Sequence, residues 1–129
     1  MKYVLYLEKR VHDYWEPYDD REDFTTVKII GVFKDFKYPY KIVEKIRQGF
    51  VDRLVLDDAL EEARYRDHNS YNRIVCVTGL NRDADYYPLD DDKHSYLRIK
   101  AWFNVTTENE NTHYLYTIQE TKEYFGTCK

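Results

Sequence analysis

Polar and apolar residues alternate most regularly over residues 95–105 of this chain. One set of alternate positions is wholly apolar: Leu97, Ile99, Ala101, Phe103 and Val105. The positions between them hold rings, cations and an amide: Tyr96, Arg98, Lys100, Trp102 and Asn104. Successive side chains of a strand point to opposite faces, so the pattern predicts a strand with an apolar core face and a basic-aromatic outer face.

Two further alternating segments lie near the start of the chain. Residues 2–11 place Tyr3, Leu5 and Leu7 on one face, and residues 24–33 place Val27, Ile29 and Phe33 together. The polar stretch between the two segments contains Pro17 and is typical of a long loop. The simplest arrangement of two strands joined in this way is an antiparallel pair.

The second half of the chain contains two more predicted strands. Residues 73–78 include an unbroken apolar run, which favours burial on both faces and makes Cys76 a core thiol. Residues 112–121 follow a polar turn at residues 108–111, so we expect them to form a hairpin with residues 95–105.

The spacing of apolar residues becomes helical after the first two strands. Residues 35–48 carry Pro39 in a first helical turn, and Gly49 is a plausible stop for the helix. Residues 50–56 fit either a short strand or more helix. Asp58 and Glu61 then have the spacing of a capping box, which predicts a second helix from about Asp57.

These elements predict an α+β protein with one domain over residues 1–129. The expected architecture is a mostly antiparallel sheet of about five strands with two helices packed on one face. A chain of 129 residues provides one sizeable core. No apolar run approaches the roughly 20 residues that cross a bilayer, and no secretory segment follows Met1, so we expect a cytoplasmic protein without membrane contacts.

Acidic residues gather with aromatic ones in two predicted loops, residues 12–23 and 79–93. The chain has a net charge of −4, and residues 51–94 hold 11 of its 24 acidic residues but only 6 of its 20 basic ones. Carboxylates can imitate the phosphates of a nucleic acid, and rings among them can anchor in a basic protein. The candidate partner-binding residues are Trp15, Tyr18, Asp19, Asp20, Asp85, Tyr86, Tyr87, Asp90, Asp91 and Asp92.

A small, acidic chain with 14 tyrosines resembles, in composition alone, the inhibitors that phages and mobile elements direct against host nucleic-acid enzymes. Tyrosine supplies large amphipathic contact area at a low cost in entropy. The resemblance implies a non-enzymatic protein that evades host defence by binding a protein partner with a basic surface.

The alternative function is binding of a single-stranded nucleic acid by the outer face of residues 95–105. Rings and cations would follow each other about every 6–7 Å along the strand, as in surfaces that stack bases. The same residues also suit contact with a protein, and a covering layer would leave them with a packing role. The acidity of the chain disfavours phosphate. The residues of this alternative are Tyr96, Arg98, Lys100 and Trp102.

A metal-dependent enzyme is the third hypothesis. Asp83, Asp85 and the acids at 90–92 could ligate a hard cation, but their spacing does not match a calcium-binding loop. The stretch from Asp67 to Asn69 lacks the further ligands of a His-based nuclease, and the apolar neighbours of Cys76 favour an inert thiol. We therefore expect no cofactor, no metal and no catalytic residue.

Overall fold

The computed structural model describes residues 2–13, 24–59, 73–88 and 95–121, and everything below refers to these ranges. One helix and six strands lie in them. Their bounds are β1 (Lys2–Asp13), β2 (Phe24–Phe33), α1 (Lys37–Ala59), β3 (Ile74–Val77), β4 (Asn81–Pro88), β5 (Ser95–Thr107) and β6 (Glu110–Thr121). The α+β class is confirmed.

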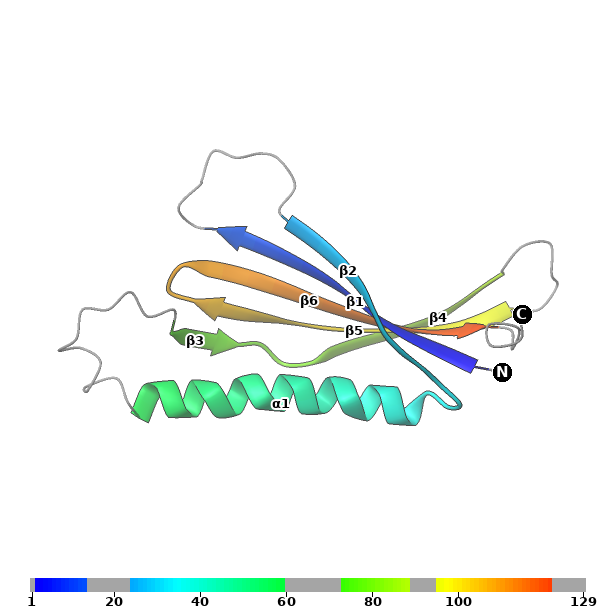
Figure 1. Cartoon of the computed structure of the whole chain (residues 1–129), viewed down its shortest axis with the longest axis horizontal. Coiled ribbons are helices and arrows are strands. Elements are labelled where there is room, and N and C mark those ends of the chain that lie inside the picture. The colour runs from blue at the N-terminus through cyan, green and yellow to red at the C-terminus, as the bar shows by residue number, and fades with distance from the viewer. Residues whose placement is uncertain (1, 14–23, 60–72, 89–94, 122–129) are drawn as a thin grey trace.

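The strands form a single twisted sheet with the order β2-β1-β6-β5-β3, in which β4 also pairs with β5. Every pair is antiparallel, so the predicted pairing of β1 with β2 and the β5–β6 hairpin are confirmed. The strands β3 and β4 follow each other along one edge of β5. Thr78 links them there, since its N–H donates to the Asn104 carbonyl at 2.9 Å. Figure 1 shows α1 lying along one face of this sheet.

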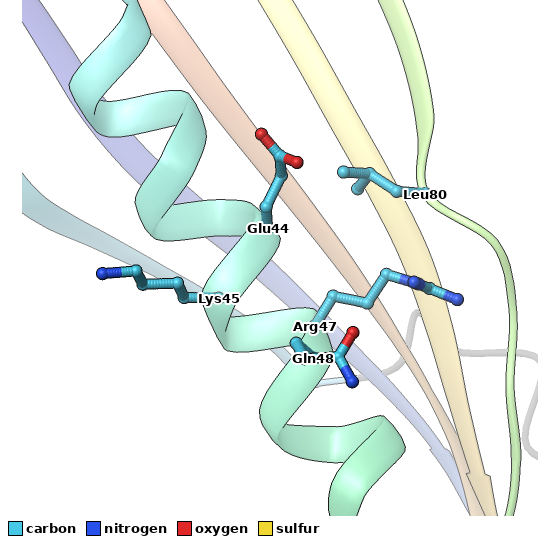
Figure 2. A pocket seen from close by; sticks show the side chains of 5 residues that line it. All are labelled: Glu44, Lys45, Arg47, Gln48 and Leu80. Atoms are coloured by element: carbon cyan, nitrogen blue, oxygen red, sulfur yellow. The ribbon is translucent and has the colours of Figure 1, made fainter.

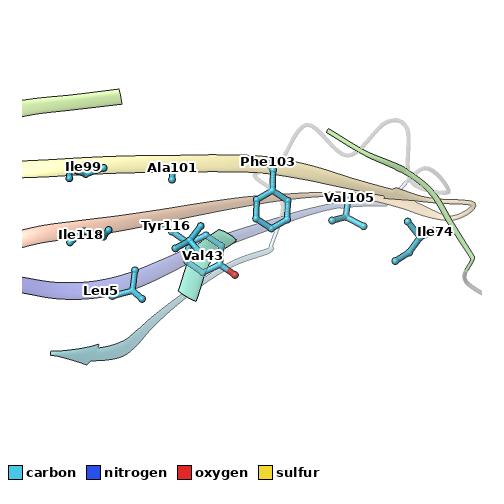
Figure 3. Close-up of a cluster of buried hydrophobic side chains, with 9 residues drawn as sticks. All are labelled: Leu5, Val43, Ile74, Ile99, Ala101, Phe103, Val105, Tyr116 and Ile118. Carbon is cyan, nitrogen blue, oxygen red and sulfur yellow. The ribbon is translucent and has the colours of Figure 1, made fainter. Parts of the chain in front are cut away.

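The core lies between α1 and the sheet face toward it, which we call the α1 side (Figure 3). The alternation predicted for β5 is confirmed, because Ile99, Phe103 and Val105 are buried there and Leu97 is half-buried. The buried apolar residues that join them are Leu5, Val43, Ile74, Ala101, Tyr116 and Ile118.

Four aromatic rings fasten α1 to the middle of the sheet. The Phe103 ring stacks on Tyr114 at 5.2 Å and on Tyr116 at 6.1 Å between ring centroids. From α1, the Phe50 ring lies 5.1 Å from Tyr114 and 5.9 Å from Phe103. Such ring pairs add stabilisation beyond the area they bury, so this cluster fixes where the helix sits.

The prediction of two helices is wrong, because α1 is one continuous helix that passes through Gly49. Partly buried Ile46, Phe50 and Leu54 keep the helical spacing across the glycine, so packing outweighs the cost of about 1 kcal/mol that glycine carries. Residues 50–56 are therefore helical. At the other end, Asp35 Oδ1 accepts the Tyr38 N–H at 2.9 Å and caps the helix.

Asp57 lies in the last part of α1 rather than at the start of a second helix. Its side chain is 1% exposed, and Oδ2 accepts the backbone N–H of Ile74 at 3.0 Å. Arg53 supplies a cation 3.8 Å from the same oxygen. Asp57 is thus a buried link from the helix to β3.

The predicted loop at residues 79–93 contains strand β4, which brings the total to six strands rather than about five. On the α1 side, β4 contacts the helix through Arg82, whose guanidinium lies over the Tyr40 ring at 5.3 Å from its centroid. The strand β3 also differs from its prediction. Only Ile74 is fully buried, whereas Val75 and Cys76 are exposed because β3 is a short edge strand.

We expect Phe103→Ala to lower the free energy of unfolding by about 3–5 kcal/mol, the cost of removing a buried ring. Urea denaturation would measure this change. Val55→Ala is the matched control, because Val55 is an exposed residue of α1 and its truncation should change stability by less than about 0.5 kcal/mol. Equal effects of the two variants would contradict the core described above.

We expect Gly49→Ala to raise the free energy of unfolding by about 0.5–1 kcal/mol, because alanine is the better helix former. A Cβ at this position meets nothing within 4 Å. Gly31→Ala is the control, since its Cβ would approach the Phe33 ring at 3.0 Å. Thermal unfolding of both variants tests this, and a lower melting temperature for Gly49→Ala would contradict a continuous helix.

Stability should fall as pH rises from about 10 to about 12. Burial raises the pKa of Tyr116 to about 12, whereas a tyrosine in the unfolded chain ionises near pH 10.0. Between these pH values the unfolded chain loses the proton that the folded chain keeps, so the unfolded state becomes more stable relative to the folded state. Tyr116→Phe keeps the ring and should flatten this dependence in urea melts. An unchanged slope would contradict the assignment.

Candidate binding face of the sheet

The sheet face opposite α1 carries no described helix, and we call it the open face (Figure 1). Residues directly opposite each other on antiparallel neighbours project from the same face. Cross-strand pairing therefore orders the open face into four rows that run from the β2 edge toward β4.

The first row consists of Val32, Val4, Gln119, Arg98 and Asp85. The second consists of Ile29, Tyr6, Thr117, Lys100 and Asp83. The third consists of Val27, Glu8, Leu115, Trp102 and Asn81. The fourth includes Arg10, His113 and Asn104. The face thus changes from apolar at β2 to charged and polar at β4.

The charged end of the open face contains an ion pair between neighbouring strands. Arg98 makes a two-pronged contact with Asp85, in which Nε donates to Oδ1 at 2.9 Å and Nη2 to Oδ2 at 2.6 Å. The hydrogen bond from Arg98 holds the pKa of Asp85 below its usual range. Asp83 stands directly opposite Lys100 in the next row. The acids of β4 therefore face the cations of β5.

The fourth row adds a polar pair. His113 Nδ1 lies 2.6 Å from Asn104 Oδ1, and because a carbonyl oxygen can only accept, the histidine nitrogen donates. Burial lowers the pKa of His113, and the positive charge of Arg10 lowers it further. His113 is thus held neutral at pH 7 and adds no cation to the face.

The residues predicted to bind a basic partner fall into two groups. Asp85 and Tyr86 lie on β4, where Asp85 faces the open side and Tyr86, paired with Leu97, lies on the α1 side and is exposed. Tyr87 pairs with Tyr96. The others lie outside the described residues: Trp15, Tyr18, Asp19, Asp20, Asp90, Asp91 and Asp92.

The residues of the nucleic-acid alternative are only partly assembled. Arg98, Lys100 and Trp102 share the open face, and each is half-buried. Tyr96 is 1% exposed, which differs from the exposed ring that the alternation predicts. Tyr114 and Tyr116 belong to the core on the α1 side and add no ring to the face.

The apolar part of the open face was not predicted from the sequence. Tyr6 and Leu115 lie near its centre, and Val27, Ile29 and Val32 lie at its β2 end. The signal was present, because residues 27–33 are apolar at nearly every position rather than at alternate ones. In the structure, Val27, Ile29 and Val32 lie on the face that α1 does not cover, and they are exposed.

The described residues hold no candidate metal site. No three His, Cys, Asp or Glu side chains among them lie close enough together to hold a metal ion. An open hollow of about 330 Å³ lies beside α1, lined by Glu44, Lys45, Arg47, Gln48 and Leu80 (Figure 2). Its Arg47 donates a hydrogen bond to the Thr78 carbonyl at 2.8 Å.

No helix in the described ranges is long and apolar enough to span a membrane.

Comparisons with known proteins found no family model, no curated protein and no solved structure that matches this chain. The function is therefore argued from the open face itself.

Proposed function

We propose that the protein is a non-enzymatic binding module whose open face contacts another protein. The observation that carries the proposal is the ordering of this face, in which aromatic and apolar side chains lie beside ion-paired ones without a covering helix in the described chain. Exposed apolar surface rimmed by polar groups is typical of protein interfaces.

The central contact surface consists of Tyr6, Leu115 and Trp102. These three side chains come from the adjacent strands β1, β6 and β5 and remain partly accessible. Aromatic residues at the centre of an interface often supply most of its binding energy, because they bury a large area with few rotatable bonds. We therefore place the binding energy at Trp102 and Tyr6.

The charges favour a protein partner over a nucleic acid. Affinity for phosphate depends on cations that are free to release counterions. Asp85 accepts two hydrogen bonds from Arg98, and Asp83 stands opposite Lys100, so both cations of β5 face a carboxylate. An inhibitor of a host nucleic-acid enzyme is the narrower form of the proposal, and the acidic composition of the chain supports it.

Single-strand binding is kept as the second candidate because Arg98, Lys100 and Trp102 do share one face. On this alternative, Trp102 stacks a base and the two cations follow the phosphates. The two candidate functions predict different effects when the acidic side chains of β4 are neutralised. Asp83→Asn and Asp85→Asn should strengthen binding to an oligonucleotide by removing negative charge, but they should leave contact with a protein centred on Trp102 almost unchanged.

The test uses purified protein as bait in a lysate of the native host. The captured protein is identified by mass spectrometry and then purified for binding measurements. We expect Trp102→Ala and Tyr6→Ala each to weaken binding by about 30-fold or more, which is the loss of a buried aromatic anchor. Tyr38→Ala is the matched control, because Tyr38 is an exposed ring on α1 and should leave the affinity unchanged.

Fluorescence anisotropy with a labelled single-stranded oligonucleotide at low salt provides the second arm. We expect no binding by the wild type. If the oligonucleotide binds, and Trp102→Ala and Lys100→Ala both abolish the signal, the second candidate replaces the first. A captured protein that binds Trp102→Ala as tightly as the wild type would remove the open face as the site.

A further inference from the structure

The outer edge of β2 is the least protected part of the described sheet. This ten-residue strand ends the sheet, with β1 on one side and no described strand on the other. Val27 is 63% exposed, Ile29 68% and Val32 47%. A long apolar edge strand presents unpaired backbone groups to any other strand, and proteins usually protect such an edge.

The opposite side of the sheet shows what that protection looks like. There the edge is made by β3, which has four residues, and by β4, which carries Asp83 and Asp85 and ends at Pro88. Short strands, charges and proline all discourage pairing with another chain. In β2, Lys28 is the single charged residue, so this edge is suited to being paired.

A β-bulge in β2 restricts how that pairing can occur. Tyr6 pairs with Ile29 and Leu5 with Gly31, so Ile30 is the extra residue. Before the bulge, Val27 and Ile29 face the open side and Lys28 faces the α1 side. After it, Val32 faces the open side and Gly31 the α1 side. The in-and-out alternation therefore shifts by one residue along the strand.

We propose that β2 pairs antiparallel with β2 of a second copy of this chain, about a two-fold axis between Ile29 and Ile30. Residues opposite each other must share a face. This axis satisfies that requirement on both sides of the bulge, since it places Val27 opposite Val32 of the partner subunit and Lys28 opposite Gly31 of the partner subunit. An axis through Ile29 would instead place Val27, on the open side, opposite Gly31 of the partner subunit, which is on the α1 side.

Charge also favours a second copy as the occupant. With the axis between Ile29 and Ile30, Lys28 lies opposite Gly31 of the partner subunit, where there is no side chain, and not opposite another lysine. The open-side positions pair valine with valine. An axis between Ile30 and Gly31 also matches the faces of two residue pairs, but it places Lys28 opposite Phe33 of the partner subunit and pairs only residues 28–33. The strand is thus complementary to itself in one best register, as a two-fold interface requires.

Sedimentation velocity on the full chain, from about 1 μM to about 500 μM, tests this association. We expect a reversible shift from the 15.8 kDa monomer to twice that mass. Ile29→Lys should abolish the shift, since it places a charge at the axis. Val55→Lys is the control, because Val55 is equally exposed on α1. A monomer at every concentration, or a dimer that survives Ile29→Lys, would overturn the proposal.

Disulfide trapping tests the register. In a Cys76→Ser, Cys128→Ser background, the double variant Val27→Cys/Val32→Cys should form a covalent dimer on mild oxidation. Val27→Cys alone should not, because in this register its two copies lie about 17 Å apart along the strands. Equal trapping by both variants would exclude the register. These readouts do not depend on whether the open face binds a protein. If the chain stays monomeric and a foreign protein binds the wild type but not Ile29→Lys, the β2 edge binds that protein and not a second copy.

Discussion

The packing of Phe50 against Phe103 and Tyr114 is the interaction on which the rest of the structure depends. It joins the single described helix to the two central strands, β5 and β6, and Tyr116 extends the same ring stack. A helix of 23 residues is about 35 Å long, so it can cover one side of the sheet and no more. Within the described residues, the opposite face of the sheet is therefore left without a helix.

Several parts of the fold could be read from the sequence because they depend on local periodicity. The alternation over residues 95–105 gave the buried face of β5, since every second residue contacts the same core. The prediction of two helices was wrong because a glycine is a local signal for a helix end. The continuous helix depends instead on contacts of Phe50 and Leu54 with the sheet, which are not local in sequence. The buried role of Asp57 could not be predicted for the same reason, because its hydrogen-bond partner lies 17 residues away.

The candidate site was harder to predict, because it depends on which strands become neighbours. The segment that forms β4 is polar and has low strand propensity, and it is held by pairing with β5 and by the Arg98–Asp85 contact. No periodicity reveals that these two charges meet. The bulge at Ile30 could not be predicted from periodicity either. It moves Phe33 to the α1 side, although Val27 and Ile29 face the open side.

The Arg98–Asp85 ion pair at β4 also determines how a partner would lie on the open face. Asp85 is about half exposed in its contact with Arg98, so this pair adds little to folding stability. Burying it under a partner would cost desolvation energy that the existing contact does not return. Binding is therefore most favourable when Trp102, Leu115 and Tyr6 are covered and the β4 acids stay in water. The charged end of the face then forms the polar rim of the interface, and the apolar rows form its centre.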